Sequence, residues 1–176
     1  MPFARDTQYR IFWRIGRNAY CRRQLVYRFI RREQCLPFRH VPTYLAGYYK
    51  YKAGDQFIEG GKPVEGKHDI CDIYAIMYET SVSVPTLDGT NAFTSPNLVS
   101  MARIKDAKET DEWTYFKLPF TTLPGKFIDK EKLTMGKYNI SIVFTSSLEG
   151  DHFNGAIGST LLIDEAELIY RSNLDH

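Results

Sequence analysis

Three side chains that could bind a sugar lie at alternate positions of one segment. Residues 113–120 read WTYFKLPF, in which Trp113, Tyr115 and Lys117 share one parity and Phe116 and Leu118 share the other. Because side chains alternate faces along a strand, Phe116 and Leu118 predict a core face and leave the first three residues pointing outward. Sugar rings have apolar faces that stack on flat aromatic rings, and hydroxyl rims that need polar partners. The pattern indicates a carbohydrate-binding surface, and the alternative is aromatic packing at the edge of a sheet.

A second set of aromatic and polar residues lies in residues 68–79, HDICDIYAIMYE. This segment is apolar on both parities, which is typical of a central strand that is buried on both faces. Asp72 and Tyr74 share one parity within it. We expect these two residues, with Lys117, to make the polar contacts to a sugar that stacks on Trp113 and Tyr115.

Carboxylates could instead hydrolyse a glycosidic bond. That chemistry needs two acids, about 5–5.5 Å apart in a retaining enzyme or about 6.5–9.5 Å apart in an inverting one. No spacing in the sequence singles out such a pair, and solvated charges on outer faces are the simpler interpretation. The candidates are Asp72, Glu79, Glu149, Asp151, Asp164 and Glu165.

Asp164 interrupts the apolar parity of the last segment, residues 161–170. Leu162, Ala166 and Leu168 share its parity, so these residues predict a core face and place a carboxylate on it. A buried charge must be paired, hydrogen-bonded or bound to metal. The residue is therefore predicted either to cap loop amides or to bind a structural calcium ion, which takes six to eight oxygen ligands.

The segments that carry these residues predict strands. Apolar runs separated by Gly- and Pro-containing loops recur along the chain, and no long window has the 3.6-residue period of a helix. We expect strands at 42–52, 68–79, 97–105, 113–120, 137–146 and 161–170, a loop at 53–67, and a short helical turn near 129–132. This order predicts an all-β protein with a jelly-roll β-sandwich fold.

The composition divides the chain in two. Residues 1–39 hold ten arginines, no lysine and two acidic residues, a net charge of +8, whereas the remaining residues have a net charge of −6. The first segment predicts no clear element, and we expect an atypical leader (1–39), a sandwich domain (40–171) and a tail (172–176). The three cysteines form no metal-binding spacing or disulfide framework, and no run is long and apolar enough for a transmembrane helix or a signal peptide. We expect no nucleic-acid partner, since only the leader is basic.

Several stretches taken in order resemble one known family. They are PTYLAGYYKYKAGD (42–55), DIYAIMYET (72–80), WTYFKLPF (113–120) and YNISIVFTSSLEGDHFNGAIGSTLLIDEAELIY (138–170). Together they are similar to the "putative carbohydrate metabolism domain" family of polysaccharide-degrading gut-type bacteria. The resemblance implies a jelly-roll domain like a carbohydrate-binding module, in a protein that is secreted, periplasmic or anchored to the cell surface. It implies a polysaccharide or oligosaccharide partner and supplies no catalytic residues.

Three functions follow from these observations. The first is a carbohydrate-binding domain of a glycan-utilisation protein; the others are a glycoside hydrolase or its accessory domain, and a structural or adhesion domain of the cell surface.

The leader has a further explanation in the genetic code. With permitted codons, a shift of one base across residues 20–39 can encode a peptide such as IAAGSLFTGSFVGSNAFRFG, which has the turns and alternating Phe of a β-sheet protein. That peptide fits the family, whereas residues 1–39 as written do not. An out-of-frame leader is therefore a hypothesis beside a disordered one.

Overall fold

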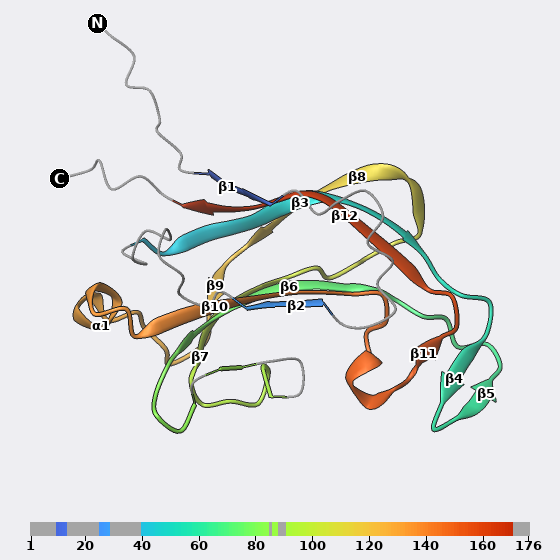
Figure 1. Ribbon diagram of the computed structural model, residues 1–176, viewed down its shortest axis with the longest axis horizontal. Helices are drawn as coiled ribbons and strands as arrows, with labels where there is room; N and C mark the ends of the chain where they lie inside the picture. The colour runs from blue at the N-terminus through green and yellow to red at the C-terminus, as the bar shows by residue number, and fades with distance from the viewer. Residues whose placement is uncertain (1–9, 14–24, 29–39, 85, 88–90, 171–176) are drawn as a thin grey trace, which may run out of the picture.

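Two antiparallel sheets lie face to face in the computed structural model, which describes residues 10–13, 25–28, 40–84, 86–87 and 91–170 (Figure 1). The upper sheet has the order β1 (Arg10–Trp13), β12 (Thr160–Tyr170), β3 (Pro42–Lys52) and β8 (Thr110–Pro119). The lower sheet has the order β2 (Leu25–Arg28), β10 (Tyr138–Thr145), β6 (Asp72–Glu79), β7 (Leu98–Arg103) and β9 (Thr121–Thr122).

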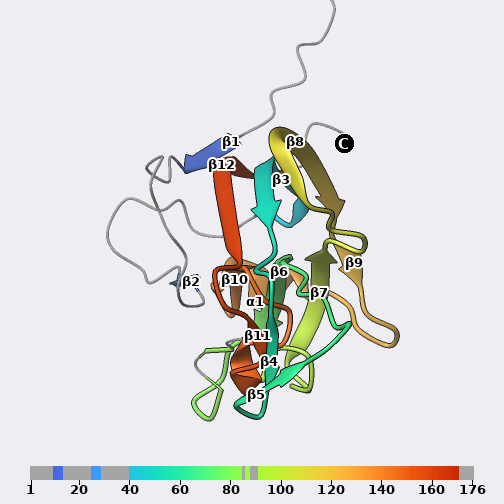
Figure 2. The ribbon, with the colours of Figure 1, turned by 90° about the vertical axis from the view of Figure 1, so that its right-hand side faces the viewer.

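A small third sheet extends one end of the sandwich. It joins β11 (Gly155–Ala156), β4 (Phe57–Glu59) and β5 (Lys62–Val64), and Figure 2 shows it below the two main layers. The hairpin of β4 and β5 lies in the segment that the sequence predicted to be a loop. The described helices are the α-helix α1 (Lys130–Thr134) and the 3-10 turn η1 (Gly150–His152), and neither is long enough to cross a membrane.

The strand pairing is that of a jelly roll. The antiparallel pairs β1–β12, β2–β10, β3–β8 and β6–β7 nest inside one another, so that the chain alternates between the two sheets. Eight strands in two Greek keys define this fold, and the all-β sandwich prediction is confirmed. Because β1 and β2 fill the first two places, residues 10–13 and 25–28 are strands where the sequence pattern predicted no element. The rest of the predicted leader (1–39) and the tail 172–176 lie outside the described residues.

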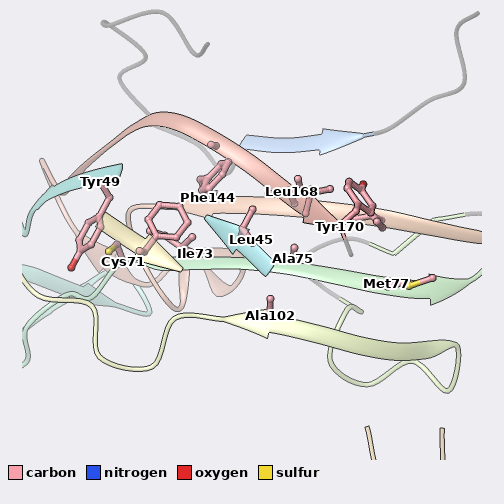
Figure 3. Close-up of a cluster of buried hydrophobic side chains, with 14 of the residues drawn as sticks. Leu45, Tyr49, Cys71, Ile73, Ala75, Met77, Ala102, Phe144, Leu168 and Tyr170 are labelled. Carbon is pink, nitrogen blue, oxygen red and sulfur yellow. The ribbon is translucent and has the colours of Figure 1, made fainter. Parts of the chain in front are cut away.

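The core lies between the two main sheets and is built by alternation along each strand. Leu45 and Tyr49 of β3, Ile73 and Ala75 of β6, and Leu168 of β12 are at most 5% exposed, and Figure 3 shows them pointing into one cluster. Burial of each large apolar side chain in this core stabilises the fold by about 25 cal/mol for every Å² of apolar surface removed from water.

Strand β6 is buried on both sides, as its continuous apolar pattern predicted. Its other face carries Tyr74, Ile76 and Tyr78, which form a second cluster with Leu87 and Ala92 from the connection between β6 and β7. That connection covers part of the outer side of the five-stranded sheet, so this side is not an open face.

In strand β12, the residues that face the core differ in part from the predicted ones. Leu161, not Leu162, joins the core, whereas Ala166 and Leu168 lie in the core as predicted. The pairing with β3 shifts between Asp164 and Glu167, and Glu165 has a φ of 48°. A β-bulge adds one residue and so inverts the alternation on either side of it. Asp164 therefore lies on the outer face of the sheet, half-buried, not in the core.

Candidate functional site

The five predicted sugar-binding residues lie on two opposite sides of the sandwich. Trp113, Tyr115 and Lys117 project from β8 on the outer side of the four-stranded sheet, away from Phe116, which is buried in the core. Asp72 and Tyr74 project from β6 on the outer side of the five-stranded sheet, since Ile73 between them points into the core. A sugar that stacks on Trp113 cannot also contact Asp72, so the two sets are separate candidates.

The outer side of the four-stranded sheet presents exposed aromatic rings. Trp113 is 42% exposed and Tyr115 is 51% exposed, although each alternates with a side chain that faces the core. Tyr115 lies opposite Tyr48 of β3, and their ring centroids are 5.3 Å apart with an angle of 55° between the planes. This tilted arrangement is a favourable aromatic pair that fixes the position of the Tyr115 ring.

Two lysines rest on rings of the same surface. Lys50 of β3 holds its Nζ 5.3 Å from the centre of the Trp113 ring and donates a hydrogen bond to the backbone carbonyl of Asp111. Lys117 holds its Nζ 4.4 Å from the centre of the Tyr44 ring. Such cation–π contacts orient both partners. We call this surface the aromatic face, made of Tyr44, Tyr48, Lys50, Trp113, Tyr115 and Lys117.

On the opposite side, the nearly buried carboxylate of Asp72 forms an ion pair with the part-exposed Arg103. Arg103 of β7 donates from Nε to both carboxylate oxygens, at 3.1 and 3.0 Å, and its Nη2 lies 2.7 Å from Oδ2. The guanidinium also lies 4.3 Å from the centre of the Phe93 ring, which itself packs on Tyr74. Burial raises the pKa of Asp72, and the bonds from Arg103 act against that rise. A carboxylate held by both oxygens in this way stabilises the sheet and is poorly placed to contact a substrate.

A small pocket opens beside this ion pair. It encloses about 30 Å³, which is room for about one or two water molecules and far too little for a sugar ring. It brings together Asp72 and Asp151, two of the carboxylates that the sequence offered for hydrolysis. Its lining residues are Asp72, Tyr74, Phe93, Thr145, Ser147, Leu148 and Asp151.

The other candidate acids are engaged or scattered. Glu149 pairs with Lys67 at 3.1 Å, and this contact lowers its pKa, while Glu79 pairs with Lys132 at 2.8 Å. Glu165 is exposed at the bulge of β12. These side chains stabilise surface contacts between segments, and they do not face one another as an acid and a base would.

The Asp164 side chain bonds to the backbone of the next residue. Its Oδ1 accepts a hydrogen bond from the amide of Glu165 at 2.9 Å, the residue whose backbone forms the bulge. Within the described residues no group of three or more His, Cys, Asp or Glu side chains is arranged to hold a metal ion. The predicted calcium ion would have one carboxylate here, which does not fit the oxygen-rich shell that calcium needs, and we derive no role for calcium.

Asp69 is the polar residue that the sequence analysis missed. Its side chain is almost fully buried, and its Oδ2 accepts bonds from Ser147 Oγ (2.6 Å), the Ala156 amide (2.8 Å) and Ser159 Oγ (2.7 Å). One carboxylate thereby ties the segment before β6 to both sides of β11. The signal for it was the run of small residues GAIGS, which leaves room for a carboxylate to reach backbone amides.

The geometry defines a jelly-roll domain with one core, a structural ion pair on one side and an exposed aromatic face on the other. The chain belongs to the family described as "Putative carbohydrate metabolism domain", whose model matches residues 33–169.

Two solved structures are similar to it. One is described as a putative glycoside hydrolase from Bacteroides thetaiotaomicron VPI-5482, with a TM-score of 0.75 and 88% identity. The match covers 78% of this chain and 40% of that one. The other is described as a putative glycoside hydrolase from Bacteroides vulgatus ATCC 8482, with a TM-score of 0.71, 46% identity, and coverage of 77% and 55%. This chain thus spans about half or less of each, and no curated protein matches it.

Proposed function

We propose that this domain binds carbohydrate on the aromatic face. The observation that carries the proposal is the exposure of Trp113 and Tyr115, at 42% and 51%, on a strand whose other side is buried in the core. A single exposed aromatic side chain is common on a protein surface, whereas neighbouring rings, the exposed Trp113 and Tyr115 and the adjacent, part-exposed Tyr48, form a contiguous patch, which is typical of a binding surface.

The face is organised before a ligand arrives. Tyr48 supports Tyr115, and Lys50 lies over Trp113, so both rings start from restricted positions. Restricting side chains in advance lowers the entropy lost on binding. Alternate residues of a strand are roughly 7 Å apart, so Trp113 and Tyr115 present neighbouring stacking positions along β8.

The family and the two similar structures support a carbohydrate as the ligand. Their descriptions name carbohydrate metabolism and glycoside hydrolases. Because those two proteins are longer than this chain, we propose that the domain holds the glycan on which a glycan-utilisation protein acts, outside the cytoplasm. Hydrolysis by the domain itself has weaker support, since Asp72 is held by Arg103 and the pocket beside it cannot contain a sugar ring.

Affinity electrophoresis in gels that contain polysaccharide tests the proposal. We expect wild-type protein to be retarded by at least one glycan, and Trp113→Ala and Tyr115→Ala to weaken binding by about 5- to 30-fold, which corresponds to about 1–2 kcal/mol for a central aromatic contact. Phe127→Ala is the matched control, since Phe127 is an exposed aromatic (75%) on the segment before α1. Equal retardation of all four proteins would remove the aromatic face from the binding site.

A further inference from the structure

The two lysines of the aromatic face carry charges that no carboxylate neutralises in the described part of the chain. Lys50 contacts a ring and a backbone carbonyl, and Lys117 contacts a ring. Lys67 also lies over an aromatic ring, that of Phe57, but its ammonium group is paired with the carboxylates of Glu59 and Glu149. An ammonium group that lies over an aromatic ring without a carboxylate partner is therefore what distinguishes Lys50 and Lys117 from the other described lysines.

The lysines stand at both ends of the stacking positions. Lys50 lies beside Trp113, and Lys117 follows Tyr115 by two residues on β8, opposite the small side chain of Ala46. The span from Trp113 to Lys117 is roughly 13 Å along the strand. An extended sugar chain on the two rings would thus meet a positive charge near each end.

Two acids, Asp111 and Glu112, are exposed on β8 directly before Trp113, at the end of the aromatic face where Lys50 donates to the Asp111 carbonyl. The other acids of this side lie on the opposite edge of β3. Asp164 is opposite Tyr48 on β12, and its carboxylate is turned to the amide of Glu165. Glu167, opposite Ala46, is only 8% exposed. The acids therefore offset the charge of Lys50, whereas the stretch of β8 around Lys117 holds no acid, and the positive charge is local to that end although residues 40–176 carry a net charge of −6. A local positive charge on an acidic domain favours a ligand with an anionic group placed to match that charge, not general attraction to polyanions.

We propose that the aromatic face selects glycans that carry negative charge, with the sugar stacked on Trp113 and Tyr115 and its anionic group bound by Lys50 or Lys117. This inference rests on the proposed carbohydrate-binding function and adds the ligand class. The anionic group is a carboxylate of a uronic acid or a sulfate ester, since both offer oxygens that accept hydrogen bonds from an ammonium group.

Pairs of polymers that share a sugar backbone but differ in charge distinguish the effect of charge on binding from the effect of the sugar. Polygalacturonate is compared with its methyl-esterified form, and dextran sulfate with dextran, by affinity electrophoresis and titration calorimetry of the full chain. The variants are Lys50→Gln, Lys117→Gln and the double variant. Lys62→Gln on β5 is the control, because it removes the same charge from an exposed site away from the face. Every variant keeps residues 1–39, so any attraction due to their arginines cancels in the comparison.

We expect the anionic form of at least one pair to bind more tightly than its neutral form, and the preferred pair tells carboxylate from sulfate. Each face variant should lose about two- to fivefold in affinity for the anionic polymer, the range of an exposed ion pair, and should respond less to added salt. Affinity for a neutral polymer should not change, and Lys62→Gln should behave as wild type.

The two proposals fail in different ways. If neutral and anionic polymers bind alike and the Lys50 and Lys117 variants match wild type, the charge selection is wrong while stacking stands. If Lys62→Gln loses as much as the face variants, or if Trp113→Ala does not weaken anionic binding, the attraction is general and the face is not the site. If no polymer is retained by wild type, both proposals are overturned.

Discussion

Replacement of Asp69 by alanine would remove the acceptor that joins three segments at one end of the sandwich. The carboxylate accepts bonds from Ser147, Ala156 and Ser159 on Oδ2, and from its neighbour Ile70 on Oδ1. Ser159 in turn accepts a bond from the amide of Gly54, at the end of β3. The loss would therefore extend from Asp69 to the start of β12 and the end of β3.

The loss of stability depends on whether each hydrogen-bond donor of Asp69 can find another acceptor. A hydrogen bond to a charged group contributes about 1.5–3 kcal/mol. The serine hydroxyls can turn to water, because both residues are only part-buried, whereas the Ala156 amide is buried and would lose its partner. We expect Asp69→Ala to lower the free energy of unfolding by about 3–5 kcal/mol, from the lost hydrogen bonds to a charged group and the buried Ala156 amide left without a partner. Asp69→Asn keeps one acceptor oxygen, and its loss should be about 1–3 kcal/mol.

Urea unfolding, followed by tryptophan fluorescence, gives these free energies from the midpoint and slope. A loss of 3–5 kcal/mol corresponds to a melting temperature lower by about 6–20 °C for a domain of this size. Asp106→Ala is the control, since Asp106 is exposed on the connection between β7 and β8 and should change stability by less than about 0.5 kcal/mol. Equal losses for Asp69→Ala and Asp106→Ala would refute the role of Asp69.

Three further predictions concern backbone, burial and the leader. Glu165→Val should lower the free energy of unfolding by about 1–2 kcal/mol, whereas Glu165→Gly should not lower it, because the φ of 48° disfavours a β-branched residue; urea midpoints decide this. Burial raises the pKa of the Cys71 thiol from 9.0 to about 12, so the folded protein holds this proton while the unfolded chain releases it. Stability should therefore fall as the pH rises from 9 to 12, by at most about 1.4 kcal/mol per unit from this group, and Cys71→Ala should flatten that part of the curve. Replacement of residues 20–39 by the frame-shifted peptide should raise the melting temperature and the soluble yield if the leader is out of frame, and an unchanged melting temperature would contradict that hypothesis.

The sequence predicted the layers of the fold because the cause is local. Alternation of apolar and polar residues sets which side of a strand is buried, and Phe116 lies in the core and Leu118 packs against it, as this rule predicted. The short helix was also predictable, since Asp129 caps the amides of Glu131 and Lys132. The hairpin of β4 and β5 was not, because its three-residue strands are stabilised by pairing with distant Gly155 and Ala156.

The sequence did not show that the candidate residues divide between two sides of the sandwich, because parity does not say which sheet a strand joins. Asp72 and Trp113 both point away from the core. Because they belong to different sheets of the sandwich, their side chains point in opposite directions. The side of the strand on which Asp164 lies could not be predicted from parity either. A single bulge at Glu165 moves it from the predicted core face to the outer face, and a count of alternate positions cannot include an extra residue that is not known in advance.

The two stretches of sequence that resemble the family most specifically have a structural explanation. They are residues 47–55 (GYYKYKAGD) and 153–170 (FNGAIGSTLLIDEAELIY), which contain the second half of β3 and all of β12, and these two strands pair with each other. The small residues near their ends fit around Asp69, and a Cβ on Gly54 would overlap the carbonyl of Ile157. Packing of this kind accounts for Gly and Ser there without any ligand. The exposed rings of Trp113 and Tyr115 and the Lys117 ammonium group on β8 are not explained by this packing, and the proposed carbohydrate binding is therefore best tested at these three residues.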